Sequence, residues 1–293
     1  MILEPVLTLR HNNAVYSVAF SSDGSLLASG SLDKSIKIWE LPSGDEKFRL
    51  QGHREAICTV SFQEGDATLL SASLDKTLRT WDLAEGKLKS TMPGHGTYLT
   101  CMAPSPDGTQ AVSGSHDKTL ILWNVTAAQQ FATLSGHTNL VSAVAYSPDG
   151  RFIVSGGHDL LIRVWDAETR QQVREIGPHQ SAIQGLAFSP DAKTLASCDT
   201  SPVVRLWNFE SGEITRTIEN HSSPVKTVEF SPDGTLLASG GSDSLILLQN
   251  ATTGEVLHTL KGHRNTIYDI AFSADGRQAA TAAFDRTARV WKL

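Results

Sequence analysis

Seven histidines at a constant spacing are the first residues of this chain that could carry chemistry. They recur every 42 residues, at His11, His53, His95, His137, His179, His221 and His263. A zinc ion needs several such ligands, together, at about 2.0–2.3 Å from the metal. Residues on one phase of a regular repeat are instead distributed one to each structural unit, so they do not converge. We therefore interpret these histidines as structural, and not as metal ligands or acid–base catalysts.

Other catalytic patterns are not found in the sequence. The repeated Ser29-Gly30-Ser31 and Ser113-Gly114-Ser115 segments lie in strand-like sequence, whereas a nucleophile elbow needs a strand-to-helix turn. No phosphate-binding loop, zinc-protease, calcium-loop or dinucleotide-binding motif is found. We expect no enzymatic activity, no cofactor and no metal. A hydrolase or lyase built on this fold is the alternative that these absences disfavour.

The repeat itself predicts the fold. All six tryptophans share a second phase of the repeat, and Gln249 takes the seventh position. Within the unit that begins at His263, residues 266–272 alternate apolar and polar as a half-buried strand does. A turn at 273–276 and two further strand-like segments follow. Self-similarity at about 40–45 residues indicates four-stranded propeller blades. We predict an all-β, seven-bladed β-propeller with four antiparallel strands in each blade, forming a single domain over residues 1–293.

The two ends of the chain predict how the ring closes. The last unit contains three strand-like segments and lacks a fourth, while Pro5-Val6-Leu7-Thr8-Leu9 resembles the fourth strand of the other units. We expect residues 1–10 to complete the blade formed by 264–293. This closure would remove an open sheet edge, which is a site of aggregation.

Composition restricts the partners. The net charge is −6, and 25 basic residues are scattered among 31 acidic ones. Proteins that bind nucleic acid through phosphate contacts are usually basic, so nucleic acid is not expected as the main partner. Three cysteines without CxxC spacing are typical of a reducing compartment. The N-terminus has no signal-peptide pattern and no apolar run is long enough to span a membrane, so we expect a cytoplasmic, monomeric ring without a membrane partner.

The Gly-His, Ser-Pro-Asp-Gly, turn-Asp and Trp elements together resemble the WD40 repeat family over the whole chain, in the regular manner of bacterial tandem arrays. The resemblance implies that each blade is locked by His, Ser or Thr, Asp and Trp, such as His137, Ser155, Asp159 and Trp165. Two units depart from this pattern. The fifth has Ser201 at the Asp position, and the sixth has Gln249 and Asn220 in place of Trp and Gly. We expect blades 5 and 6 to be the softest or the most specialised.

The resemblance also implies recognition on the narrow face around the central channel. The positions expected there lie three and five residues after each histidine and one residue before each turn aspartate. Tyr268 and Phe284 of blade 7 would lie beside Tyr16 and Leu32 of blade 1 as an aromatic patch, and exposed aromatics are common interface anchors. From these positions we predict the partner-binding residues Tyr16, Leu32, Leu74, Tyr98, His116, His158, Gln184, Lys226, Tyr268 and Phe284.

The function predicted from these observations is a non-catalytic scaffold that binds protein or peptide partners on the narrow face. One alternative is a sensor or regulatory domain of a larger signalling protein, such as a kinase or NTPase. Another is a propeller that binds nucleic acid through a local basic patch.

Overall fold

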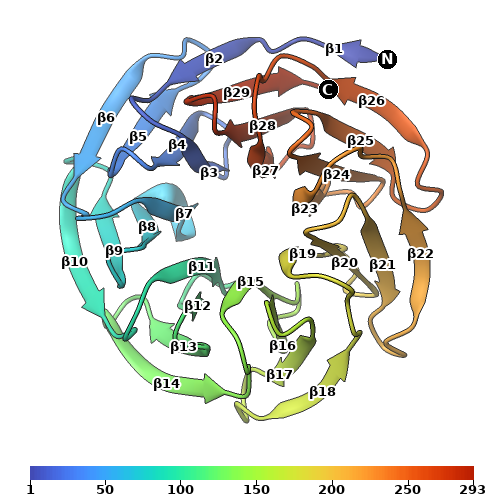
Figure 1. Ribbon diagram of the computed structural model, residues 1–293. Coiled ribbons are helices and arrows are strands. Elements are labelled where there is room, and N and C mark those ends of the chain that lie inside the picture. Colours follow the sequence, from blue (N-terminus) through green and yellow to red (C-terminus); the bar gives the residue numbers. More distant parts are fainter.

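Each repeat of the sequence forms one four-stranded antiparallel sheet, and seven such sheets surround a central channel (Figure 1). This computed structural model describes the backbone of residues 1–293 and every side chain except that of Glu64. The described backbone contains a single short helical turn, η1 (Glu64–Asp66). The predicted all-β, seven-bladed propeller is therefore confirmed.

The strands of each blade run outward from the channel in sequence order, and each blade is numbered by its repeat. Blade 1 consists of β3 (Val15–Phe20), β4 (Leu26–Ser31), β5 (Ser35–Glu40) and β6 (Glu46–Gln51). Blade 2 consists of β7 (Ile57–Phe62), β8 (Thr68–Ser73), β9 (Thr77–Asp82) and β10 (Lys87–Pro93). Blade 3 consists of β11 (Leu99–Pro104), β12 (Gln110–Ser115), β13 (Thr119–Asn124) and β14 (Gln129–Ser135). Blade 4 consists of β15 (Val141–Tyr146), β16 (Phe152–Gly157), β17 (Ile162–Asp166) and β18 (Gln172–Ile176).

The remaining three blades keep the same order. Blade 5 consists of β19 (Ile183–Phe188), β20 (Thr194–Asp199), β21 (Val204–Asn208) and β22 (Ile214–Ile218). Blade 6 consists of β23 (Val225–Phe230), β24 (Leu236–Gly241), β25 (Ile246–Asn250) and β26 (Val256–Leu260). Blade 7 consists of β27 (Ile267–Phe272), β28 (Gln278–Ala283), β29 (Thr287–Lys292) and, from the start of the chain, β2 (Leu7–Arg10).

Strand β2 closes the ring without a covalent link. It pairs antiparallel with β29, from Leu7 opposite Val290 to Arg10 opposite Thr287. The predicted closure is thus confirmed, but its boundary is narrower than residues 1–10. Strand β1 (Ile2–Leu3) continues past blade 7 and pairs in parallel with β26 of blade 6, opposite Thr259 and Leu260. The N-terminal segment therefore ties the last two blades together.

The turns between the first and second strands are fixed by short polar side chains. In blade 3, Ser105 Oγ donates to Asp107 at 2.5 Å and accepts the N–H of Gln110 at 2.9 Å. The same carboxylate accepts the N–H of Thr109 at 3.0 Å. Gly108 has a φ of 69°, a left-handed conformation that glycine adopts without steric cost. The Ser-Pro-Asp-Gly sequence is therefore a turn with a defined hydrogen-bond network.

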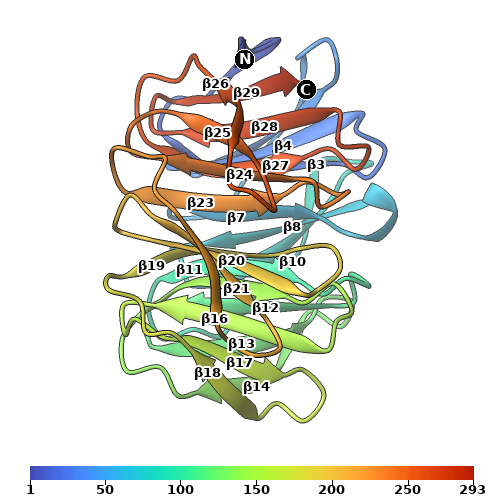
Figure 2. The same ribbon diagram turned by 90° about the vertical axis from the view of Figure 1, so that its right-hand side faces the viewer.

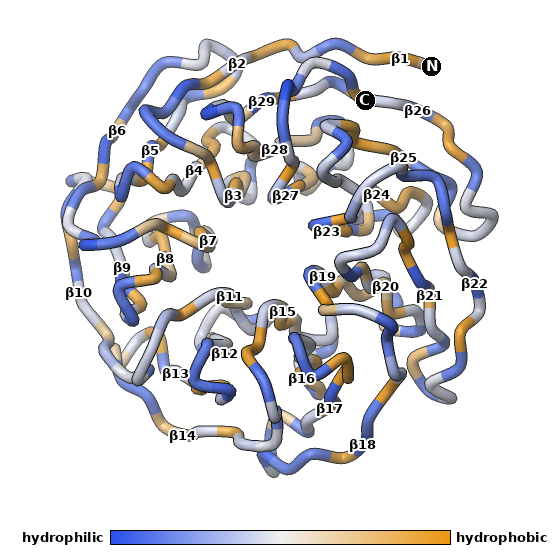
Figure 3. Tube along the Cα trace, in the orientation of Figure 1, coloured by the Kyte–Doolittle hydropathy of each residue, from blue (hydrophilic) through white to orange (hydrophobic). Residues whose placement is uncertain are grey.

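The hydrophobic core lies between neighbouring blades. Ile36 and Ile38 of blade 1 pack with Ile57, Val60 and Trp81 of blade 2, and all five are buried. Figure 3 shows hydrophilic stretches along the loops and along outer strands such as β18, whose side chains are mostly exposed. Within the described chain, no helix has the length and apolar character needed to cross a bilayer.

Seen edge-on, the loops emerge on two opposite faces of the ring (Figure 2). The narrow face is the one that carries the seven repeat histidines and the turns between second and third strands. The wide face carries the turns between first and second strands, such as residues 105–108. Every candidate residue predicted from the sequence belongs to the first of these faces or to the adjoining channel wall.

Candidate functional site

A buried hydrogen-bond chain in each blade holds the narrow face rigid. In blade 4, His137 Nδ1 lies 2.8 Å from Asp159 Oδ2 and His137 Nε2 lies 2.7 Å from Ser155 Oγ. The indole N–H of Trp165 donates to the same Ser155 Oγ at 2.8 Å. The lock implied by the resemblance is therefore present with its four expected members. Asp159 Oδ1 is buried without a hydrogen-bond partner among the described residues, but the other polar atoms of this network are paired, and paired buried networks rigidify a structure.

The chemistry of the groups determines the direction of this chain. An ionised carboxylate only accepts, so the histidine donates from Nδ1 and its Nε2 accepts the serine hydroxyl. Burial lowers the pKa of His137 from its usual value, although the charge of Asp159 opposes that effect. In blade 3, burial raises the pKa of Asp117, but hydrogen bonds from Thr119 and the interaction with His95 outweigh it and hold that pKa at about 2. These groups are therefore a neutral histidine and a charged aspartate, held in place as structure.

Blade 5 restores its lock with a different aspartate. Asp199, two residues before the usual position, lies 2.8 Å from His179 Nδ1 and accepts from Ser201. Arg205 Nη1 also donates to Asp199, at 2.6 Å. The side chain of Asp199 is fully buried, so this ion pair compensates a buried charge.

Blade 6 restores its lock with two amides. Gln249 is completely buried and its Nε2 donates to Ser239 Oγ at 2.7 Å, as the tryptophan N–H does elsewhere. Asn220 Nδ2 then donates to Gln249 Oε1 at 3.0 Å. Both departures from the repeat are thus satisfied internally, and the greater softness expected of blades 5 and 6 stays a prediction.

A backbone hydrogen bond places two of the predicted surface positions side by side in every blade. The residue before the turn aspartate, or before its equivalent, donates its N–H to the carbonyl of the residue three after the histidine. In blade 7 this bond joins Phe284 to Thr266 at 2.9 Å, and in blade 3 it joins His116 to Tyr98 at 3.0 Å. The corresponding pairs are Leu32 and Ala14, Leu74 and Ala56, His158 and Leu140, Thr200 and Ala182, and Ser242 and Pro224.

Aromatic rings meet across the junction of blades 7 and 1. The rings of Tyr16 and Tyr268 lie 4.8 Å apart, edge to face at 88°. The ring of Phe284 lies 6.3 Å from that of Tyr268 and is 45% exposed. Leu32 is partly buried and follows β4 of blade 1. We call Tyr16, Leu32, Tyr268 and Phe284 the seam patch.

The other predicted residues form two smaller groups. Tyr98 and His116, both exposed, are in edge contact at 5.6 Å in blade 3. Across the channel wall, Lys226 Nζ donates to Gln184 Oε1 at 3.1 Å. His158 is exposed; partial burial first, and then the positive charges of His116 and Lys226, lower its pKa. These residues make blades 3 to 6 the polar side of the face. Leu74 is partly buried and belongs to neither group.

The channel narrows to a cavity of about 280 Å³ beneath this face. Tyr16, Gln184, Lys226 and Tyr268 all line it. Not every position expected on the face is accessible, because Ala14 and Ala56 are buried. At these two positions the small side chain packs inside the blade, and only the residue paired with it reaches the surface.

Two acidic residues of the channel wall were missed by sequence reasoning. Burial raises the pKa of Asp269 to about 6, against the lowering effect of its hydrogen bond from the Val18 N–H. Burial and the nearby Asp269 raise the pKa of Glu229 to about 8. The sequence does mark Glu229 as unusual, because the other six units have Ala or Ser at its repeat position. A comparison of the seven units at that phase would have found it.

The described side chains contain no group of three or more His, Cys, Asp or Glu arranged to hold a metal ion. All three cysteines are free, and burial raises the pKa of the Cys101 thiol to about 12. A thiol with a raised pKa is a poor nucleophile. The predicted residues thus place aromatic rings at the junction of blades 7 and 1 and a lysine at the channel.

Comparison with known proteins identifies the repeat. The family described as "WD domain, G-beta repeat" matches seven consecutive segments: 3–40, 44–82, 86–124, 128–166, 170–208, 212–248 and 254–292.

Curated proteins match over shorter stretches. A probable serine/threonine-protein kinase, PkwA, of Thermomonospora curvata is 52% identical over 50 residues, which is 17% of this chain and 7% of the kinase. The vegetative incompatibility protein HET-E-1 of Podospora anserina is 62% identical over 34 residues, 12% of this chain and 2% of that protein. Protein tipD of Dictyostelium discoideum is 48% identical over 42 residues, 14% of this chain and 7% of tipD. The matched part thus spans less than a tenth of each relative.

Proposed function

This chain belongs to the WD40 repeat family, whose propellers are generally non-catalytic scaffolds for protein interactions, and we propose that it binds a protein or peptide partner through its narrow face. The seam patch is the proposed anchor. The observation that carries the proposal is the contact of Tyr16 with Tyr268 across two blades, with the ring of Phe284 exposed beside them.

Three physical properties support the seam patch as an anchor. Clustered aromatic side chains bury a large area on binding and are frequent hot spots; in the seam patch Phe284 is exposed, and Tyr16 and Tyr268 are partly exposed. The rings lie on strand ends or turns held by the blade lock, so little order has to be gained when a partner binds. Finally, the patch adjoins the channel cavity that Tyr16 and Tyr268 line, so a side chain of the partner has a recess to enter.

The polar side of the face contributes selectivity in this proposal. Lys226 and the imidazoles of His116 and His158 favour an acidic or hydrogen-bond-accepting segment of the partner. Such charges act mainly on association rate and on rejection of wrong partners. The partner would therefore place an apolar side chain at blades 7 and 1 and an acceptor group toward blades 3 to 6.

A second candidate function is regulation within a longer polypeptide. The observation that favours it is the length of the curated relatives, one of which is named as a probable kinase and is covered by this chain over only 7% of its length. In that arrangement the narrow face would bind a signal or an adjoining domain. Sequencing the full reading frame that encodes this chain tests this candidate.

Site-directed photocrosslinking tests the proposed function directly. A photoreactive p-benzoylphenylalanine at Phe284 should crosslink to bound partners, because the exposed ring would lie at the centre of the interface. The same residue at Lys87, which is exposed at the start of outer strand β10, provides the control. Crosslinked products from position 87 and none from 284 would overturn the proposal.

A further inference from the structure

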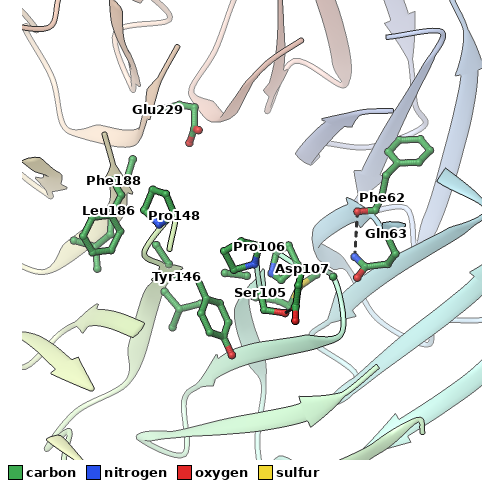
Figure 4. A pocket seen from close by; sticks show the side chains of 17 residues that line it. Phe62, Gln63, Ser105, Pro106, Asp107, Tyr146, Pro148, Leu186, Phe188 and Glu229 are labelled. Atoms are coloured by element: carbon green, nitrogen blue, oxygen red, sulfur yellow. Dashed lines mark hydrogen bonds between the residues drawn. The ribbon is translucent and has the colours of Figure 1, made fainter. Parts of the chain in front are cut away.

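Four departures from the sevenfold repeat line one cavity on the wide face. The cavity has a volume of about 660 Å³ and is bordered by blades 2 to 6 (Figure 4). Gln63 stands where the other six units have Ser, and Pro104 stands where they have an aromatic ring. Tyr146 is the single tyrosine among those six rings, and Glu229 replaces Ala or Ser. We call this space the wide-mouth cavity. The repeat departs from its pattern at four residues around it, on three successive phases.

Several apolar side chains line the wide-mouth cavity, beside a larger area of polar atoms. At the end of the first strand, Phe62 of blade 2 and Phe188 of blade 5 line the cavity, and the two blades between them have Pro104 and Tyr146 at this position. Pro106 and Pro148, from two neighbouring turns, extend the same surface (Figure 4). A volume of this size lies within the range of ligand-binding pockets, about 300–1,000 Å³.

Two polar atoms of the wall have no partner among the described side chains and backbone. Gln63 is only 7% exposed, and its Nε2 donates to the carbonyls of Ser61 and Phe62 while its Oε1 accepts from nothing. Tyr146 Oη is equally buried and unpaired. Buried polar atoms are almost always hydrogen-bonded, so the partners of these two atoms are to be sought in solvent or in a bound group.

The wide-mouth cavity has acidic residues in its wall and no basic ones among the described side chains. Asp107 at the turn of blade 3 and Glu229 on β23 are the two acidic residues that line it. Figure 4 shows Glu229 on the side of the cavity opposite to Gln63. Glu229 makes no hydrogen bond or ion pair with any described side chain. Burial and the nearby Asp269 raise the pKa of Glu229 to about 8, so a cationic group that paired with this carboxyl would displace its proton to solvent.

We propose that the wide-mouth cavity binds a lysine or arginine side chain of a peptide. The aliphatic stem would pack on Phe62 and Phe188, as long basic side chains pack along apolar surfaces. Its cationic head would pair with the carboxyl of Glu229. A peptide N–H would donate to Gln63 Oε1 and satisfy that orphaned acceptor. The wide-mouth cavity shares Glu229 with the channel cavity beneath the narrow face, but no residue of the seam patch lines it, so this proposal does not rest on the proposed function of the narrow face.

The test compares two side chains that differ in charge and share an aliphatic stem. Fluorescein-labelled, terminally blocked pentapeptides Gly-Ala-X-Ala-Gly, with X as lysine, arginine or norleucine, are titrated with the full chain and followed by fluorescence anisotropy. We expect the lysine or the arginine peptide to bind at least about tenfold more tightly than the norleucine peptide. Equal binding of all three, or no binding up to millimolar protein, would overturn the proposal without requiring any variant to fold.

Matched variants then locate the site. Glu229→Gln should abolish the preference for the basic peptides while leaving the norleucine affinity unchanged. Asp275 is the blade 7 counterpart of Asp107 and lies outside the cavity. Asp275→Asn is therefore the control for general charge attraction and should leave the peptide affinities unchanged. Tyr268→Ala should also leave the peptide affinities unchanged, which separates this site from the seam patch. A lysine preference that survives in Glu229→Gln would overturn the proposal.

Discussion

The side-chain amide of Asn220 donates to the amide oxygen of Gln249 at 3.0 Å, and so joins the two residues by which blade 6 departs from the repeat. In blade 3 the corresponding residues are Gly94 and Trp123. A Cβ atom added to Gly94 would lie 2.6 Å from the Trp123 ring. The indole and the missing side chain are therefore complementary, and the smaller Gln249 creates the space that Asn220 fills. The residue before the repeat histidine is Arg10 in blade 1 and Pro178 in blade 5, so these two blades have neither Gly nor Asn at this position.

This relationship predicts strong coupling between positions 220 and 249. Gln249→Trp alone should destabilise the protein by roughly 1–3 kcal/mol, because the indole would overpack against Asn220. Adding Asn220→Gly should recover most of that loss. Urea unfolding of the wild type, both single variants and the double variant measures the coupling energy. Purely additive effects would show that the two residues do not form a unit.

The blade lock predicts a graded response within blade 4. Trp165→Ala should lower the free energy of unfolding by about 3–5 kcal/mol, because it removes a large buried side chain. His137→Ala should cost about 1–3 kcal/mol, since Asp159 loses the hydrogen bond from the imidazole and the Ser155 hydroxyl loses its acceptor. Denaturant melts that find the two variants equal to the wild type would refute the lock.

Closure of the ring predicts different effects for two truncations. Removal of residues 1–10 deletes β2 and exposes the edge of β29, so the midpoint of thermal unfolding should fall sharply and aggregation should follow. Removal of residues 1–4 deletes only the two-residue pairing of β1 with β26 and should have a much smaller effect. Thermal scans with light scattering measure both. A wild-type melting temperature after the longer deletion would contradict the closure.

The raised pKa of Glu229 in the channel wall predicts that the stability of the protein falls as the pH rises. Glu229 has a pKa raised to about 8 by burial and by Asp269, above its ordinary value of 4.5 in the unfolded chain. The unfolded chain therefore releases this proton at lower pH than the folded chain does. Stability should consequently fall as the pH rises from about 4.5 to about 8.

Glu229→Gln removes this titration. The variant should unfold at higher denaturant concentration than the wild type at pH 8.5, and the advantage should shrink at pH 5. Chemical unfolding at these two pH values measures the difference. A constant difference between variant and wild type across this range would show that Glu229 titrates normally.

Much of the fold could be predicted from the sequence because the repeat is regular. Strand order and the pairing of β2 with β29 follow from residue phase, whereas the His137–Asp159 contact is implied by the resemblance to the WD40 family. Side-chain replacements within the lock could not be predicted, because Asp199 and Arg205 compensate for Ser201 only through their positions in three dimensions. Burial also depends on the neighbouring blade, so Ala14, which shares its repeat position with exposed Tyr98, proved to be inaccessible.

The candidate site could be predicted in part for the same reason. Phase places Tyr16, Tyr268 and Phe284 near one junction, and the ring contacts confirm this placement. The repeat pattern does not encode the identity of the partner, because binding also depends on the surface of that second molecule. Glu229 was overlooked because it lies among first-strand residues that read as ordinary strand sequence.

Binding by the seam patch is the central claim, and affinity capture with matched variants tests it most directly. Wild-type protein, Tyr268→Ala, Phe284→Ala and the rim variant Lys87→Ala are immobilised in parallel, and the affinity of each captured partner is then measured. Both patch variants should weaken binding by about 2 kcal/mol or more, roughly 30-fold in Kd, with little change in folding stability. Lys87→Ala should bind as the wild type does. Patch variants that retain every partner, while Lys87→Ala loses one, would contradict the account and move the search to the outer strands.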